Sequence, residues 1–149
     1  MAADQDPPSR DATLPNGYRL RREAPTLEEY VRMRTVAGLS PITAAQAAGP
    51  LETSWAWCTV RDGDGCLAAM GRVLGDGGWY FHIADVATDP AHQRRGLGRA
   101  VMEDLISRID DEAPPKPYIT LLGDPPGRSL YRSLGFVDSE PSLGMRLPR

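Results

Sequence analysis

The most regular pattern in the chain is an apolar residue at every fourth position after Asp89-Pro90. The repeating side chains are Leu97, Val101, Leu105 and Ile109. This spacing places them on one face of a helix, while charged residues fill most of the other positions. The pattern predicts an amphipathic helix that ends before Pro114-Pro115, because proline cannot continue the helix and restricts the residue before it.

Ahead of this helix the pattern shifts to the period of two that is typical of strands. Three segments are rich in aromatic, small and β-branched residues: 54–60, 66–74 and 79–87. Short Gly- and Asp-rich turn signals separate them, which predicts an antiparallel meander. Alternation along the first strand places Trp55 and Trp57 on one face.

The region before the meander predicts one strand and two helices. An alternating run at 17–23 indicates the strand. Thr26 and Glu29 have the spacing of a capping box, so we expect a helix from there to about Gly38. A short second helix is expected at 43–48.

After the long helix the sequence predicts a strand, a helix and a closing pair of strands. The strand is expected at Tyr118–Leu122. Asp124-Pro125 has the residue types that begin a helix, and Gly135 the type that follows one. The short segments Phe136-Val137 and Met145-Arg146-Leu147 indicate the closing strands.

Composition narrows the class of protein. The chain has 149 residues, of which 41% are hydrophobic and 25% charged, and this fits a single domain, expected at 17–149. Residues 1–16 are polar and proline-rich, and we expect a disordered tail there. A net charge of −3 gives no basic footprint for nucleic acid, and no apolar run approaches the roughly 20 residues of a membrane helix. The N-terminus lacks the apolar stretch of a signal peptide, so we expect a cytoplasmic protein without membrane or nucleic-acid partners.

The two cysteines do not suggest a metal site. Cys58 and Cys66 are eight positions apart, and neither belongs to a zinc-binding spacing. We expect both to be buried strand thiols in a reducing compartment.

The stretch from Asp89 to Arg99 joins a strand end, a Gly/Arg loop and the start of the long helix. Free N–H groups and the helix dipole make such an N-terminus attractive to phosphate. Gly96 and Gly98 would let backbone amides approach a pyrophosphate closely. A Walker loop is excluded because the only lysine, Lys116, lies elsewhere, and a Rossmann fingerprint is excluded because the preceding strands form a meander.

Two motifs resemble those of the GNAT family of N-acetyltransferases. Gln93-x-x-Gly96-x-Gly98 matches the family's coenzyme A pyrophosphate motif, and residues 130–136 are similar to its second signature, a Tyr before Gly-Phe. Residues 84–90 resemble the family's fourth strand and its exit. The resemblance implies an α/β fold with a mixed, mostly antiparallel twisted sheet of six to seven strands, flanked by about four helices.

The resemblance also implies acetyl-coenzyme A as co-substrate and no metal. It places the contacts at the end of the fourth strand, along the Gly/Arg loop and on the last helix. The implied residues are Val86, Ala87, Thr88, Gln93, Arg94, Arg95, Gly96, Leu97, Gly98, Arg99 and Ser129. Many members hold pantetheine with an Asn after the fifth strand, where this chain has Gly123-Asp124-Pro125. Either Asp124 caps the last helix only, or Ser129 substitutes for the Asn.

In this family the amine attacks the acetyl carbonyl directly. The resemblance assigns the Val86 N–H to the thioester oxygen and the Tyr131 hydroxyl to the leaving sulfur. The alternative for Tyr131 is a packing residue beside a basic loop that only caps a helix. Candidates to take the amine proton are Asp85, His82 and Glu52, and Asp85 is preferred because it ends the strand beside the expected acetyl site. A structural carboxylate at the strand bulge is the alternative for Asp85.

The acceptor is expected between the first helix, the strand with the two tryptophans and the strand that begins near Tyr80. Candidates to line its pocket are Trp55, Trp57, Met33 and Leu39. The leading function is N-acetylation of a small primary amine. Alternatives are acetylation of protein N-termini or lysines and a non-catalytic acetyl-coenzyme A-binding module, and a homodimer is left open as the assembly.

Overall fold

The computed structural model describes residues 14–149, so most of the expected disordered tail lies outside the described residues. Five strands form one sheet: β1 (Arg19–Arg21), β2 (Ala56–Arg61), β3 (Leu67–Gly75), β4 (Tyr80–Thr88) and β5 (Tyr118–Leu121). Four α-helices accompany it: α1 (Leu27–Val36), α2 (Ala44–Thr53), α3 (Leu97–Glu112) and α4 (Arg128–Ser133). Short 3-10 turns at Pro90–His92 and Pro125–Gly127 precede α3 and α4.

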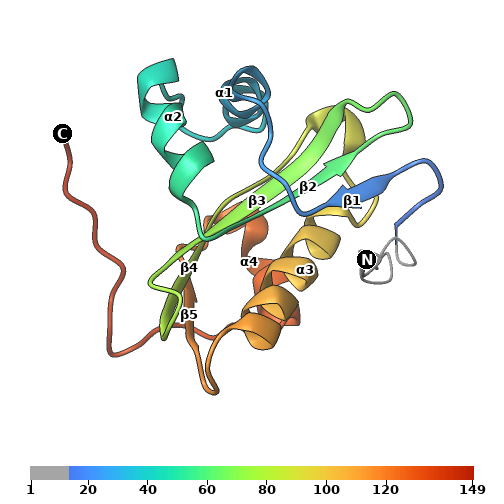
Figure 1. Cartoon of the computed structure of the whole chain (residues 1–149). Coiled ribbons are helices and arrows are strands. Elements are labelled where there is room, and N and C mark those ends of the chain that lie inside the picture. The colour runs from blue at the N-terminus through green and yellow to red at the C-terminus, as the bar shows by residue number, and fades with distance from the viewer. Residues whose placement is uncertain (1–13) are drawn as a thin grey trace, which may run out of the picture.

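The strands follow one another in the sheet in the order of the sequence. Neighbours from β1 to β4 are antiparallel, which confirms the predicted meander, and β5 joins β4 in parallel after the crossover through α3. Helices α1 and α2 cover one face of the sheet, and α3 and α4 cover the other (Figure 1). Each face therefore has its own apolar core.

The apolar repeat that predicts α3 faces the larger core. Its four residues are at most 1% exposed and pack against the inner side chains of β2, β3 and β4. Gly71 in β3 makes this approach possible, because a Cβ there would lie 2.7 Å from Cγ1 of Val101. Tyr30 and Met33 from α1 fill the second core against Trp57 and Met70 of the sheet.

Capping residues decide where the first two helices begin. In α1 the Glu29 amide donates to Thr26 Oγ1 at 3.2 Å, and the Thr26 amide donates to the Glu29 carboxylate at 2.9 Å. Thr43 and Gln46 form the same reciprocal pair at the start of α2. The second helix runs to Thr53, beyond the predicted 43–48, because it continues through Pro50.

Two sequence predictions about side-chain placement are wrong. Trp55 precedes β2 and packs with Phe81 on the α3 side, with the guanidinium of Arg108 over its ring, whereas Trp57 packs edge-on against Tyr30 on the α1 side. The two tryptophans therefore do not share a face. Cys58 is buried as expected, but Cys66 is exposed in the loop before β3.

The closing pair of strands is also wrong, which leaves five strands in the described residues in place of six or seven. Residues 134–149 form no strand, and every residue from 137 onward is exposed. Figure 1 shows this C-terminal segment leaving the fold after α4. A strand needs hydrogen bonds along an edge, and the segment meets β5 only near its end, where Gly144 lies against Leu122.

Candidate functional site

A bulge and an early strand end open the sheet beside β4. Met70 pairs with Ala87 and Arg72 pairs with Ala84, so two residues of β4 face one residue of β3. The parallel pairing with β5 ends at Ile83, while β4 continues to Thr88. The C-terminal half of β4, from Ala84 to Thr88, thus has no strand partner on its β5 side among the described residues.

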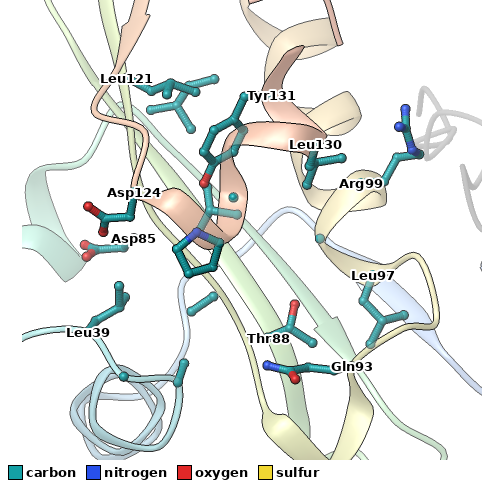
Figure 2. A pocket seen from close by; sticks show the side chains of 18 of the residues that line it. Leu39, Asp85, Thr88, Gln93, Leu97, Arg99, Leu121, Asp124, Leu130 and Tyr131 are labelled. Carbon is teal, nitrogen blue, oxygen red and sulfur yellow. The ribbon is translucent and has the colours of Figure 1, made fainter. Parts of the chain in front are cut away.

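A cleft of about 560 Å³ fills this opening. Figure 2 shows Tyr131, Asp124 and Asp85 toward one part of the cleft and Thr88 and Gln93 toward the other. Arg99 also lines the cleft, but it lies beside Leu130 and donates from Nη2 to Ser133 Oγ at 2.5 Å. Most of the residues predicted to bind the co-substrate line it: Val86, Ala87, Thr88, Gln93, Arg94, Gly96, Leu97, Gly98 and Arg99.

Two predicted contacts lie outside the cleft lining. Arg95 turns away and donates from Nη1 to the Tyr18 hydroxyl at 2.9 Å, with its guanidinium 5.9 Å from the centre of that ring. Ser129 is exposed on α4 and does not line the cleft. Their proposed contacts are therefore not supported by this geometry.

The start of α3 has the form expected of an anion site. Gly96 adopts a φ of 77° at the N-cap, a left-handed conformation that disfavours side chains with a Cβ. A Cβ added there would meet no atom within 4 Å, so the space beside Gly96 at the start of α3 is open. A phosphate group fits this space, where the helix dipole and free N–H groups favour negative charge.

Tyr131 reaches the cleft from α4 by crossing Gly127. A Cβ at Gly127 would lie 2.8 Å from the Tyr131 hydroxyl oxygen, so only glycine leaves room for the ring. The hydroxyl has no hydrogen-bond partner among the described residues, and in Figure 2 it points into the cleft. Burial raises the pKa of Tyr131, and the charge of Asp124 raises it further. The phenol is therefore protonated at neutral pH and can donate.

Asp85 occupies the bulge with a φ of 55° and is surrounded by donors. Its carboxylate accepts from the Tyr30 hydroxyl at 2.6 Å and from Arg72 Nε at 2.5 Å, and it also pairs with Arg34. Burial raises the pKa of Asp85, but hydrogen bonds from Tyr30 and Arg72, with the charges of Arg72 and Arg34, outweigh it, so the pKa lies below its usual value. This geometry favours a structural carboxylate at the bulge.

The other two candidate bases do not line the cleft. His82 is half-buried, and its Nδ1 lies 2.9 Å from Oγ1 of Thr120. Burial, together with the charge of Arg72, lowers the pKa of His82. Glu52 is exposed on α2.

Asp124 is the residue of the site that sequence reasoning passed over. It was considered only as a helix cap, yet its side chain makes no capping hydrogen bond. Asp124 is an exposed residue of the cleft lining, and no ion pair joins it to another described residue. Asp124 and Tyr131 line the same cleft, and the charge of Asp124 contributes to the raised pKa of Tyr131. The available signal was the Asp in place of the family's Asn.

Comparison with known proteins decides the family. Residues 41–145 match the family model described as "Acetyltransferase (GNAT) domain". The chain belongs to the GNAT acetyltransferase family. The resemblance drawn from the two motifs is thereby confirmed.

Several known proteins share the fold or part of the sequence. A structure from methicillin-resistant Staphylococcus aureus, of a protein of unknown function called a probable acetyltransferase, is 34% identical, with a TM-score of 0.83 over 89% of this chain and 99% of the other. Serotonin N-acetyltransferase 2, chloroplastic, from Oryza sativa subsp. japonica is 33% identical over 66% of this chain and 48% of its own length. A predicted acetyltransferase from Clostridium acetobutylicum, solved with acetyl-coenzyme A, has a TM-score of 0.66 over 87% of this chain and 96% of the other at 14% identity, and so shares the fold.

The matches to the curated relatives are partial. The chain spans about a third to a half of the length of the first of them. Within the part of the chain that the structure describes, no helix is both long and apolar enough to cross a membrane, and no three potential ligands are gathered for a metal ion.

Proposed function

We propose that this GNAT protein transfers the acetyl group of acetyl-coenzyme A to a small primary amine. The observation that carries the proposal is one cleft with an anion-binding helix start at one part and an unpartnered tyrosine hydroxyl at another. Acetyl-coenzyme A carries an acyl thioester at one end and a pyrophosphate further along. The thioester suits the part of the cleft with the tyrosine hydroxyl, and the pyrophosphate suits the start of the helix.

The residues that would hold acetyl-coenzyme A are among those that line the cleft. Gly96 and Gly98 offer backbone amides at the start of α3, with Gln93 and the side chains of Arg94 and Arg99 around them. Exposed backbone along β4 from Val86 can pair with an extended amide chain as an added strand does. The Val86 N–H is the proposed donor to the thioester oxygen.

Tyr131 is the proposed acid toward the leaving thiolate. A thiol has a pKa near 8.5 and a phenol near 10, so complete proton transfer is uphill by about 2 kcal/mol. Burial makes Tyr131 a weaker acid still. Its contribution is therefore a hydrogen bond that stabilises the thiolate as it leaves, for which a protonated phenol is well suited.

We propose that Asp124, in place of Asp85, accepts the proton that the amine loses. Asp85 is occupied by two arginines and a tyrosine, so a proton there would break the interactions that hold the bulge. Asp124 is free to attract a protonated amine into the cleft. It can accept the proton that the ammonium must lose before its nitrogen lone pair can attack the acetyl carbonyl; the second proton, which the nitrogen loses after the attack, leaves with the thiolate as coenzyme A thiol.

The part of the cleft where the amine would bind favours a small molecule as the acceptor. Leu39 and Gly38, from the loop after α1, line the cleft opposite α4 and limit the space there. The expected tryptophan-lined pocket is not present, since Trp57 and Met33 are core residues at 5% and 0% exposure. Leu39 alone of the four expected lining residues faces the cleft.

The test is release of free coenzyme A with a panel of acceptors. The panel contains aromatic ethylamines, aliphatic amines, amino sugars and peptides with free N-termini or lysines. Turnover with a small amine that falls in Asp124→Asn supports the proposal. Turnover with peptides alone would replace it by protein acetylation. Binding of acetyl-coenzyme A without turnover on any acceptor would indicate a binding module.

A further inference from the structure

Two residues of the loop before α3 bind the hydroxyl of the same tyrosine. Tyr18 directly precedes β1, and its side chain is 6% exposed because it belongs to the apolar core beneath α3. Its backbone is held as well, since the Tyr18 amide donates to the Pro15 carbonyl at 3.2 Å. The phenol oxygen is therefore a fixed point beside the loop.

The Tyr18 hydroxyl can accept from one loop residue and donate to the other at the same time. Arg95 Nη1 donates to the oxygen at 2.9 Å, and the oxygen lies 2.7 Å from Nδ1 of His92. A guanidinium can only donate, so the phenol proton is available to His92 Nδ1. The Asp62 carboxylate lies 3.7 Å from the other ring nitrogen of His92 and favours a proton there, which leaves Nδ1 to accept.

The aromatic ring of Tyr18 contacts the same two side chains. The His92 ring meets it edge-on, with centroids 5.7 Å apart and planes at 89°. The Arg95 guanidinium lies 5.9 Å from the ring centre. Each loop residue thus contacts Tyr18 at both its oxygen and its ring.

The two residues between these contacts line the cleft. They are Gln93 and Arg94, and Arg94 has a φ of 62°, a left-handed conformation that is unfavourable for any residue with a Cβ. Such a conformation persists only where surrounding contacts hold it. Tyr18 provides contacts on both sides of Arg94, through His92 before it and Arg95 after it.

We propose that Tyr18 is a positioning residue of the acetyl-coenzyme A site, which acts through His92 and Arg95 to hold the cleft-lining segment 93–94 in the conformation that binds the pyrophosphate. Arg95 then contributes by its bond to Tyr18, which accounts for its turning away from the cleft. Tyr18 lies outside residues 41–145, so the family match alone does not assign it this role. The inference rests on the donor site of the proposed function and is independent of the acceptor and of Tyr131.

The first test is Tyr18→Phe, which keeps the ring and every charge near the cleft and removes only the hydroxyl. Calorimetry with coenzyme A should show a Kd about tenfold higher, the scale of one lost hydrogen bond. At saturating acetyl-coenzyme A, kcat should stay within about twofold of wild type, because the change affects binding and not the reacting atoms. Tyr118→Phe, on β5 and outside the cleft lining, is the matched control and should keep the wild-type Kd. An unchanged Kd in Tyr18→Phe, or a loss in kcat alone, would overturn the inference.

A double-variant cycle tests whether Arg95 acts through Tyr18. Arg95 is exposed, so Arg95→Met should spare the fold while it removes both the bond to Tyr18 and a positive charge. The loss of coenzyme A affinity in Tyr18→Phe/Arg95→Met should be clearly smaller than the two single losses combined. Fully additive losses in binding free energy would show that the two residues act separately, and would reject the role of Tyr18.

A donor without pyrophosphate distinguishes a local defect from a general one. With acetyl-pantetheine, kcat/KM should be the same in wild type and Tyr18→Phe, whereas with acetyl-coenzyme A it should fall about tenfold. Equal falls with both donors would mean that the variant disturbs the whole cleft, and would overturn the inference. A wild type that binds no coenzyme A in the calorimeter would instead refute the donor site itself, and the proposed function with it.

Discussion

Replacing Gly127 by alanine should remove most of the activity while sparing the fold. Gly127 has a φ of −92° and a ψ of −14°, a conformation that alanine adopts without strain. The added methyl group, however, would lie 2.7 Å from Cε2 of Tyr131 and 2.8 Å from its hydroxyl oxygen. The perturbation is therefore confined to the end of one ring that faces the cleft.

The contact distances give the size of the effect. Non-bonded carbon atoms settle at about 3.5–4.0 Å, so the ring end has to move by about 1 Å. A displacement of this size at a catalytic group costs up to about 10²-fold in rate. The free energy of unfolding should change little, because the ring end moves within an open cleft and alanine reduces the entropy of the unfolded chain.

The assay measures kcat with the best amine from the panel, together with the melting temperature and the affinity for acetyl-coenzyme A. Tyr131→Phe should lose about 10²-fold in kcat, the usual scale for a general acid. Gly49→Ala is the matched control, since a Cβ at this α2 glycine meets no atom within 4 Å. The double variant Gly127→Ala/Tyr131→Phe should be no slower than Tyr131→Phe alone, because the hydroxyl to be misplaced is already gone.

Two results would refute this reasoning. Wild-type kcat in Tyr131→Phe would end the assignment of Tyr131 as the acid. A normal kcat in Gly127→Ala, with a reduced one in Tyr131→Phe, would show that the hydroxyl acts from a position that Gly127 does not control. A large drop in melting temperature in Gly127→Ala would place the fault in folding.

Three further predictions concern the donor site, the bulge and the amine. Gly96→Val should abolish the rise in melting temperature that acetyl-coenzyme A causes, because valine resists a φ of 77°; a normal rise would place the pyrophosphate elsewhere. Asp85→Asn should lower the free energy of unfolding by about 3–5 kcal/mol at pH 7, since two arginines lose their counter-charge. The pKa of Asp85 is depressed in the folded state, so its contribution is present above the unfolded pKa near 3.9 and is lost as the pH falls through the lower folded value; urea unfolding at pH 7 and pH 2 should show a much smaller gap between wild type and variant at pH 2. Asp124→Asn should reduce kcat/KM about 10²-fold at neutral pH, and an unaltered kcat/KM would exclude Asp124 as the proton acceptor.

The parts of the fold that local chemistry specifies were predictable. The meander follows from alternation and Gly/Asp turns, and α3 follows from an apolar residue at every fourth position. The capping box of Thr26 and Glu29 predicted the start of α1. Each of these signals lies within a few residues of the structure it determines.

The wrong predictions concern strand pairing and side-chain placement, which the local sequence does not determine. Met145 and Leu147 have a strand pattern, but whether a strand forms depends on an available edge. Trp55 and Trp57 were placed on one face by simple alternation, yet β2 begins only at Ala56, so the alternation does not extend to Trp55.

The site shows the same division. The backbone parts, Gly96 and the end of β4, were predictable because glycine and the strand–loop–helix order report directly on backbone geometry. The roles of the two carboxylates, Asp85 and Asp124, were not predictable from the sequence. The sequence left open whether Asp85 is a base or a structural carboxylate, because the arginines that pair with it come from positions 34 and 72, on α1 and β3. Asp124 looked like a helix cap because Asp-Pro is the usual sequence of one.

Arg34, from the side of the cleft where the amine would bind, helps to hold the bulge in β4 by pairing with Asp85. Arg34 comes from the last turn of α1, just ahead of the loop with Leu39, and the same side chain also donates to the Ser40 carbonyl at 2.8 Å. One guanidinium therefore joins the acceptor loop to the backbone that would face the thioester. A substitution in that loop that alters amine choice should also move the oxyanion donor, so selectivity and turnover would change together in evolved variants and cannot be tuned as independent traits.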